Sequence, residues 1–369
     1  MFSDDDNGEA IDIMQHLVPL IGEGKVIPVI SNAFRIEEIF REDEELSRMM
    51  SEVPQFYDEF RTFDQQLTKK WAASINYPMS DDHNLARVAQ YLQVEKGGSF
   101  EDPRRKYIQF LINRLLSLSE TNEQYKDDEE YRNIVAGFRK PPKGKTYSFS
   151  EAARGLGYPR FMNGREDPLR LLARLPLKIY ITTSYSNFLE RALEKEGKTP
   201  RTQLCFFKVD KTIITTPEHL PDRDFNPTEK TPAVVHLFGL EDYTKTLVVS
   251  EDDYITFLMN AVENIKSDDM FPSYLRGALS GFSGWSLLLL GYHLRGWDFR
   301  TLFRFISRIR NINDTDTPSI AIQFKPRLER KENEAALKYL EKYLSKGKFM
   351  VEWNNTEEFI YELWEAWNA

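Results

Sequence analysis

The sequence of 369 residues contains a single cysteine, Cys205. One cysteine excludes an intramolecular disulfide framework and any zinc site built from several cysteines, so the sequence suits a reducing compartment. Lysine and arginine (49) are outnumbered by aspartate and glutamate (58), which gives a net charge of -9. This balance argues against sequence-independent binding of a nucleic-acid backbone, because such binding rests on clustered positive charge.

Long apolar runs are absent as well. No run approaches the roughly 20 residues that span a bilayer, and the acidic start MFSDDDNGEA has neither the basic region nor the apolar stretch of a secretion signal. We therefore expect a cytoplasmic chain that contacts no membrane. Aromatic residues are plentiful, with 25 Phe, 17 Tyr and 6 Trp, and both signs of charge are mixed along the chain, as in a folded globular protein.

Short apolar runs flanked by turn residues alternate with longer stretches of helical spacing, which is typical of strands covered by helices on both faces. The predicted strands are 25–30, 177–183, 233–239, 285–292, 319–324 and 348–353, with 246–250 as a shorter candidate. The predicted helices of the second half are 184–197, 251–265, 298–311, 331–347 and 356–368. The alternation predicts an α/β fold with a Rossmann-like, doubly wound and mostly parallel sheet.

The region from about Phe40 to Leu172 has a different character. It contains helical patterns and the loop-like segment FRKPPKGKTYSFS, but no convincing strand. We interpret it as a large helical insertion after the first strand. The expected organisation is then a first strand and turn in 1–40, the insertion in 41–172, and the remainder of the Rossmann-like domain in 173–369.

Ligands of open α/β sheets bind beyond the carboxyl ends of the strands, so the residues after each run are the candidate site. A glycine-rich GxGxxG turn is missing after the first strand. Ser31, Asn32 and Ala33 stand there instead. Two interpretations remain open for this turn, namely a nucleotide-binding turn at a helix N-terminus and a simple capped helix.

Polar and small residues also follow two other strands. The segment ITTSYSN places Thr183, Ser184 and Asn187 after the second strand, and helix capping accounts for only part of this cluster. In LLLLGYHLRGWD, Gly291 opens a turn, and Asp298 lies in the first turn of a helix. Asp298 is expected either to cap that helix or to accept hydrogen bonds from a ribose hydroxyl.

AVVHLFG contains one histidine inside an apolar strand. Because side chains alternate along a strand, His236 and Phe238 share a face, and Gly239 is the residue at the strand end. A histidine in this position is more often a core residue with a hydrogen bond than a catalyst. A catalytic role for His236 remains the alternative.

Taken in order, the small-residue turn, ITTSYSNFLERAL, VVHLFG with TLVVSEDDYITFL, and LLLLGYHLRGWDFRTLF resemble the bacterial sirtuin-like domains of anti-phage and conflict-system proteins. The resemblance covers most of the chain and is best at 179–193, 233–257 and 286–306. It implies NAD as substrate or ligand, with no metal. It also implies cleavage of NAD to nicotinamide and ADP-ribose, as in many defence members.

The resemblance also shows departures. The family's asparagine falls on Ser184, its histidine before the glycine falls on Phe238, and its glycine turn falls on 31–33. The candidate catalytic residues are Ser184, His236 and Asp298. The candidate NAD-binding residues are Ser31, Asn32, Ala33, Thr183, Asn187, Phe238, Gly239 and Gly291.

Three functions are compatible with these residues. The first is a divergent NAD glycohydrolase of prokaryotic immunity that acts when activated in a complex. The second is a catalytically inactive sirtuin-like module that serves as nucleotide sensor or scaffold. A plain α/β enzyme for another nucleotide or sugar phosphate is the third. The resemblance implies a homo-oligomer or a defence partner such as an ATPase, an Argonaute-like protein or a sensor protein.

Overall fold

The computed structural model describes seventeen stretches of the chain. These are residues 12–52, 62–95, 101–122, 125, 127–161, 164–205, 219–220, 222, 224–264, 266, 271–280, 284–293, 296–309, 317–323, 338–339, 341–345 and 348–369. Within them, no helix combines the length and apolar character that a bilayer crossing requires.

One seven-stranded sheet forms the centre of the molecule, and all its strands are parallel. The strand order is β3-β4-β2-β1-β5-β6-β7. β1 therefore lies in the middle of the sheet, with β2, β4 and β3 on one side of it and β5, β6 and β7 on the other. The strands are β1 (Val26–Ile30), β2 (Ile179–Thr182), β3 (Arg201–Leu204), β4 (Ala233–His236), β5 (Ser286–Leu290), β6 (Ser319–Gln323) and β7 (Phe349–Trp353). This confirms the predicted Rossmann-like α/β fold.

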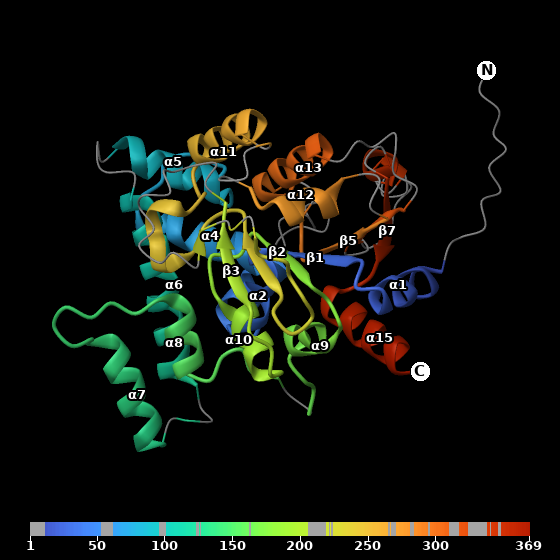
Figure 1. Cartoon of the computed structure of the whole chain (residues 1–369). Coiled ribbons are helices and arrows are strands. Elements are labelled where there is room, and N and C mark those ends of the chain that lie inside the picture. Colours follow the sequence, from blue (N-terminus) through green and yellow to red (C-terminus); the bar gives the residue numbers. More distant parts are fainter. Residues whose placement is uncertain are drawn as a thin grey trace.

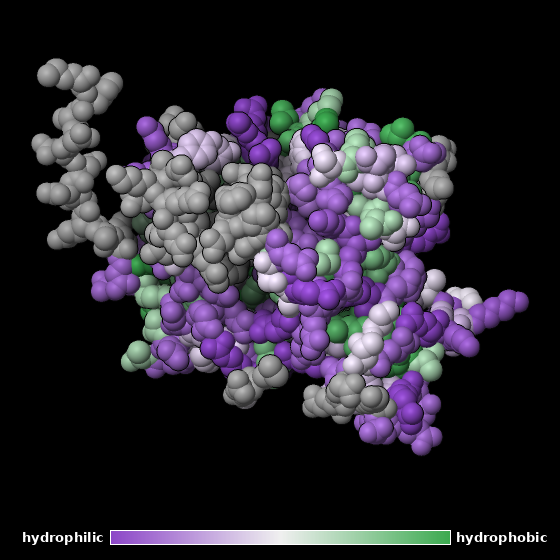
Figure 2. Space-filling model, turned by 180° about the vertical axis from the view of Figure 1, so that it is seen from behind, coloured by the Kyte–Doolittle hydropathy of each residue, from purple (hydrophilic) through white to green (hydrophobic). Residues whose placement is uncertain are grey.

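Helices cover both faces of the sheet, and Figure 1 shows α11, α12 and α13 on one side and α1, α9, α10 and α15 on the other. Those helices are α1 (Ile13–Gly22), α9 (Pro168–Arg174), α10 (Phe188–Lys195), α11 (Glu251–Asn264), α12 (Ser273–Leu279), α13 (Trp297–Ile309) and α15 (Thr356–Asn368). The apolar strands are buried because both their faces meet helices. The outer surface is mostly hydrophilic in the view from behind (Figure 2).

The described residues between β1 and β2 form helices and no strand, as the sequence predicted. They are α2 (Asn32–Phe40), α3 (Glu44–Glu52), α4 (Phe63–Ser74), α5 (Leu85–Glu95), α6 (Glu101–Thr121), α7 (Glu129–Arg139) and α8 (Phe149–Gly155), followed by α9. Helices α4 to α8 gather beside the β3 and β4 edge of the molecule (Figure 1). The domain boundaries drawn from the sequence, 1–40, 41–172 and 173–369, stay predictions.

Two buried contacts bind this helical insertion to the chain that follows β4. The Arg104 guanidinium on α6 donates to the carbonyl oxygen of Leu247 at 2.8 Å and pairs with both carboxylate oxygens of Asp253 on α11. Arg104 and Asp253 are 2% and 3% exposed. The Glu241 carboxylate accepts hydrogen bonds from the backbone amides of Phe149 and Ser150 at the start of α8, at 2.6 and 3.1 Å.

Two details differ from the sequence prediction. The segment 246–250 is not a strand, because the 3-10 helix η5 (Glu241–Thr246) precedes it and the amide of Val248 bonds back to the Phe238 carbonyl. The edge strand β3 was not predicted, since RTQL is short and polar. Of the predicted helix 331–347, the described residues 338–339 and 341–345 are helical, and the rest lies outside the described residues.

Candidate functional site at the carboxyl edge of the sheet

The turn after β1 lies at the carboxyl edge of the sheet, between the ends of the two neighbouring strands β2 and β5. Ser31 caps α2 by accepting a hydrogen bond from the amide of Phe34 at 3.2 Å, and its hydroxyl donates to the Gly291 carbonyl at 2.5 Å. Gly291 has a φ of +75°, and a Cβ there would meet Ser31 Oγ at 2.7 Å and Phe34 Cβ at 2.6 Å. Only glycine therefore lets the β5 end approach α2 so closely.

Polar side chains from the β2 end meet this turn. The Thr183 hydroxyl lies 3.0 Å from the Tyr292 hydroxyl, directly after β5. Asn32 Oδ1 lies 3.4 Å from both the Ser184 hydroxyl and the Tyr185 amide, which donate to it. The structure thus brings Ser31, Asn32, Thr183, Ser184 and Gly291 together at one edge, while Ala33 is buried in the first turn of α2. Their predicted roles in NAD binding stay predictions.

Asn187 begins α10 without capping it. Its side chain makes no hydrogen bond to the helix, and its Oδ1 is buried with no partner among the described residues. An unsatisfied buried acceptor costs about 1–3 kcal/mol. This oxygen could therefore accept a hydrogen bond from a donor group of a ligand. Asn187 directly follows Ser186, whose hydroxyl lies 2.9 Å from the Ser184 hydroxyl.

His236 is the last residue of β4 and is fully buried. Its Nδ1 is 3.0 Å from the Ser184 carbonyl oxygen and its Nε2 is 2.8 Å from Oε1 of Glu190 on α10. Both partners are acceptors, so both ring nitrogens donate and no lone pair is left to take a proton. This geometry favours the core alternative, and a catalytic role for His236 remains a prediction.

The charge on this pair follows from its surroundings. Burial disfavours the charged ring, but the Glu190 carboxylate and the hydrogen bonds outweigh it and raise the pKa of His236. In the same way, burial opposes ionisation of Glu190, and the neighbouring His236 outweighs it and lowers the pKa of that carboxyl. The two residues therefore form a buried ion pair that joins β4 to α10.

Phe238 occupies the position at which the family's histidine is expected. It is 1% exposed and packs edge-to-face against Tyr254 and Phe257, with ring centroids 5.3 and 5.2 Å away. Gly239 follows with a φ of +87°, and a Cβ there would lie 2.4 Å from the Thr246 backbone. An aromatic cluster and a tight backbone contact thus fill the turn after β4, and the Phe238 ring cannot accept a proton.

Acidic side chains and a histidine gather on the other side of β1. His293 follows β5, and its Nε2 lies 3.4 Å from Oε1 of Glu37 on α2. Asp298 lies in the first turn of α13, and Asp64 lies in the first turn of α4. The sequence singled out Asp298 but not Glu37, Asp64 or His293. His293 could have been identified from the sequence, because it closely follows a predicted strand. Asp64 lies in the insertion, far from any predicted strand end, so the sequence offered no signal for it.

The charges of this acidic group perturb one another. Burial raises the pKa of Asp64 to about 7, and Asp298 and Glu37 add to the rise while His293 opposes it. Burial also raises the pKa of Asp298, against hydrogen bonds from the backbone. For His293, burial is outweighed by Glu37, Asp298 and Asp64, and its pKa is raised. Perturbed titrating groups that interact with one another make this group a candidate site.

We expect Asp64→Asn to stabilise the protein by about 1–2 kcal/mol above pH 7, after allowance for solvent screening of this partly exposed group. The folded-state pKa of Asp64 lies above its ordinary value, so ionisation costs stability as pH rises from about 4 to about 7. The gain should disappear below pH 4, where both states are protonated. Denaturant unfolding of both proteins at pH 4 and pH 8 measures it, and an equal effect at both values would contradict the assignment.

Among the described residues, no group of three or more His, Cys, Asp or Glu side chains has the geometry to hold a metal ion. In a comparison with known protein families, residues 178–346 match the SIR2-like domain. No curated protein matches the chain. The match begins just before β2, and the sheet adds β1 between β2 and β5, so the turn at Ser31 belongs to the same edge.

Proposed function

Because residues 178–346 form a SIR2-like domain, and such domains bind NAD in general, we propose that this chain binds NAD at the carboxyl edge of β1, β2 and β5. We propose further that it acts as a sensor or scaffold of prokaryotic immunity and is not by itself an efficient NAD glycohydrolase. The immune role and a partner protein rest on the resemblance of the motifs alone.

The polar groups at this edge have the chemistry that would hold a dinucleotide. The first turn of α2 offers backbone amides without intrahelical acceptors, which suit phosphate oxygens. The buried and unpartnered Oδ1 of Asn187 suits a ribose hydroxyl as donor. Thr183 and Ser184 add hydroxyl groups that both donate and accept. When bound, NAD supplies the glycosidic bond whose cleavage would release nicotinamide.

The proposal of weak catalysis rests on one observation, namely that neither His236 at the end of β4 nor Phe238 in the turn after it can accept a proton. His236 donates from both ring nitrogens, and Phe238 has no group that accepts a proton. Loss of general-base help typically costs about 10²–10⁴ in rate. Ser184, in the position of the family's asparagine, is hydrogen-bonded to neighbouring side chains and has a shorter reach.

A second function, hydrolysis of NAD, is favoured by the acidic group. A pKa of about 7 for Asp64 suits a general acid or base at neutral pH, and Asp298 and His293 interact with it. In this alternative, these residues replace the missing asparagine and histidine. Activation in an oligomer or by a partner protein would then bring them into contact with the ligand.

Titration calorimetry with NAD and chromatographic detection of nicotinamide separate the two functions. We expect the full chain to bind NAD with little or no nicotinamide release. Asn187→Leu should weaken binding about tenfold, because a hydrogen bond contributes about 1.5 kcal/mol. Asn84→Leu, at a half-buried helix start in the insertion, serves as the matched control. Absence of binding by the wild type would contradict the proposal.

The same assay tests catalysis. Brisk turnover that survives His236→Phe but disappears in Asp64→Asn would establish the second function. Turnover that disappears in His236→Phe while calorimetry still shows NAD binding and the variant stays folded would identify His236 as the base.

A further inference from the structure

Helix α11 has an exposed apolar stripe on the face that turns away from the sheet. Ile255, Met259 and Val262 are 46%, 61% and 52% exposed, and their spacing of four and three residues places them on one side of the helix. The opposite face buries Tyr254, Phe257 and Ala261. Hydrophobic (green) residues interrupt the purple surface at the upper rim in Figure 2, the side on which α11 lies in Figure 1. Contiguous exposed apolar surface marks interaction sites.

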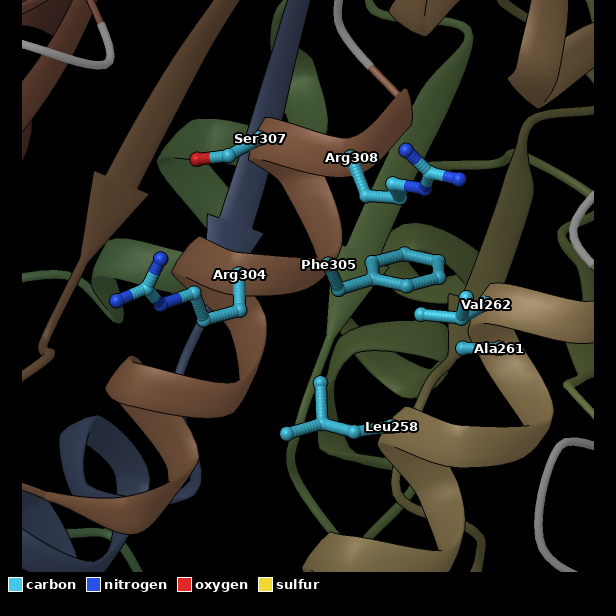
Figure 3. Close-up of a pocket in the computed structure, with 7 residues that line it drawn as sticks. All are labelled: Leu258, Ala261, Val262, Arg304, Phe305, Ser307 and Arg308. Carbon is cyan, nitrogen blue, oxygen red and sulfur yellow. The ribbon is translucent and has the colours of Figure 1, made fainter.

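A hollow of about 430 Å³ lies beside this stripe, between α11 and α13. The Phe305 ring forms its floor and points towards Ala261 and Val262, with Leu258 below (Figure 3). The Arg308 side chain extends from α13 on the same side as the Phe305 ring, and the Arg304 side chain extends from the opposite side of that helix (Figure 3). A groove of this kind between two helices is the shape that receives the apolar face of a third helix.

Charges of opposite sign border the groove and the stripe. Helix α13 exposes Arg300, Arg304 and Arg308, one turn apart, and no ion pair joins them to an acid in the part of the chain that the structure describes. Helix α11 exposes Glu263 near its end and Asp252 near its start, where one Asp252 carboxylate oxygen also accepts a hydrogen bond from the Gln90 amide of α5 at 2.8 Å. The chain thus presents a basic groove and an acidic apolar helix on one surface, although its net charge is -9.

The two helices run in the same direction. Near their starts, the Tyr254 and Trp297 rings stack with centroids 6.0 Å apart, and further along, Phe257 and Phe305 meet at 5.6 Å. A copy of α11 laid antiparallel into the groove would therefore bring its Asp252 to the Arg308 end and its Glu263 to the Arg300 end. Because the same surface supplies both halves, a two-fold axis near Met259 would make the contact self-complementary.

We propose that the stripe and groove of α11 and α13 are a homodimer interface, occupied by α11 of a second copy of this chain. The apolar side chains of each α11 fill the groove of the other copy, and the carboxylates at the ends of α11 pair with the arginines of α13. This inference is independent of NAD binding.

Sedimentation velocity on the full chain, as a concentration series up to the micromolar range, tests the proposal. We expect a dimer for the wild type and a monomer for Met259→Asp, which places a charge at the centre of the stripe. Because Met259 is 61% exposed, this variant should fold normally. Met79→Asp, at a site 50% exposed outside this surface, is the matched control and should stay dimeric. Arg308→Glu should weaken the dimer about tenfold or more, since it leaves like charges in contact.

A cysteine at the axis tests the antiparallel geometry. The native Cys205 is buried, and burial raises the pKa of its thiol, so it does not compete as a reactive group. Met259→Cys should form a disulfide-linked dimer under mild oxidation, and Met79→Cys should not. A wild type that is monomeric at every concentration, a dimer that survives Met259→Asp, or failure of Met259→Cys to cross-link would each overturn the proposal.

Discussion

Replacing Arg104 with methionine is expected to lower the free energy of unfolding by about 3–5 kcal/mol, because it leaves the Asp253 carboxylate buried without its partner. The Asp253 carboxylate also accepts the amides of Val249 and Ser250 at the start of α11, so the loss extends to that helix start. Methionine keeps most of the side-chain volume, and the change therefore reports on charge more than on packing. Urea unfolding followed by circular dichroism measures the effect.

Arg87→Met is the matched control for this experiment. Arg87 on α5 also pairs with an acid of α11, since its Nε lies 3.1 Å from Glu251, but its side chain is 53% exposed. Exposed ion pairs contribute about 0–1 kcal/mol. Equal losses in the two variants would show that burial of the Arg104 pair adds nothing. The double variant Arg104→Met with Asp253→Asn should recover part of the loss, because the uncompensated charge is removed.

The variant His236→Phe is expected to lose about 3–5 kcal/mol near pH 6, because Glu190 then remains charged and buried, with the Thr202 hydroxyl as its remaining side-chain partner among the described residues. The stabilisation from His236, whose folded-state pKa is raised, is complete below about pH 6.5 and is lost as pH rises through that pKa. The contribution of Glu190, whose pKa is lowered, is present above about pH 4.5 and is lost as pH falls through its folded-state pKa. The loss should therefore be greatest between about pH 4.5 and 6.5.

Unfolding of both proteins across pH 4 to 9 tests this profile. His83→Phe provides the control, because His83 lies near Asp82 at 3.8 Å with a third of its side chain exposed, and its loss should stay below about 1 kcal/mol. The double variant His236→Leu with Glu190→Leu should be nearly as stable as the wild type, since a buried pair replaced by apolar groups is often neutral. A flat pH profile for the difference between wild type and His236→Phe would contradict the ion pair.

The sequence predicted the central strands because a strand covered on both faces has to be apolar throughout, as in SLLLL of β5 and VIPVI of β1. It missed β3, since an edge strand of four mostly polar residues carries no such pattern. It misassigned 246–250, because this segment is apolar and buried like a central strand, whereas its Val248 amide bonds to the Phe238 carbonyl ten residues earlier and the segment is not part of the seven-stranded sheet.

For the site, the principle that ligands bind beyond strand ends brought Ser31, Asn32, Thr183, Ser184 and Gly291 to one edge, as the structure shows. The partner of His236 could not be predicted, because Glu190 lies in a helix 46 residues away and reads as an ordinary surface acid of an amphipathic helix. Asp64 was missed for the same reason, since its place beside Asp298 depends on how the insertion folds back.

Glu241 connects the helical insertion to the chain that follows β4 through hydrogen bonds. Its carboxylate holds the start of α8, and burial raises its pKa to about 7. On the other side of η5, Arg104 of α6 holds the Leu247 carbonyl. Between these two anchors runs η5, and Gly239 lies two residues before Glu241, in the turn after β4. The Glu241 and Arg104 contacts therefore fix the positions of α8 and α6 relative to the chain that follows β4 through two short, buried links.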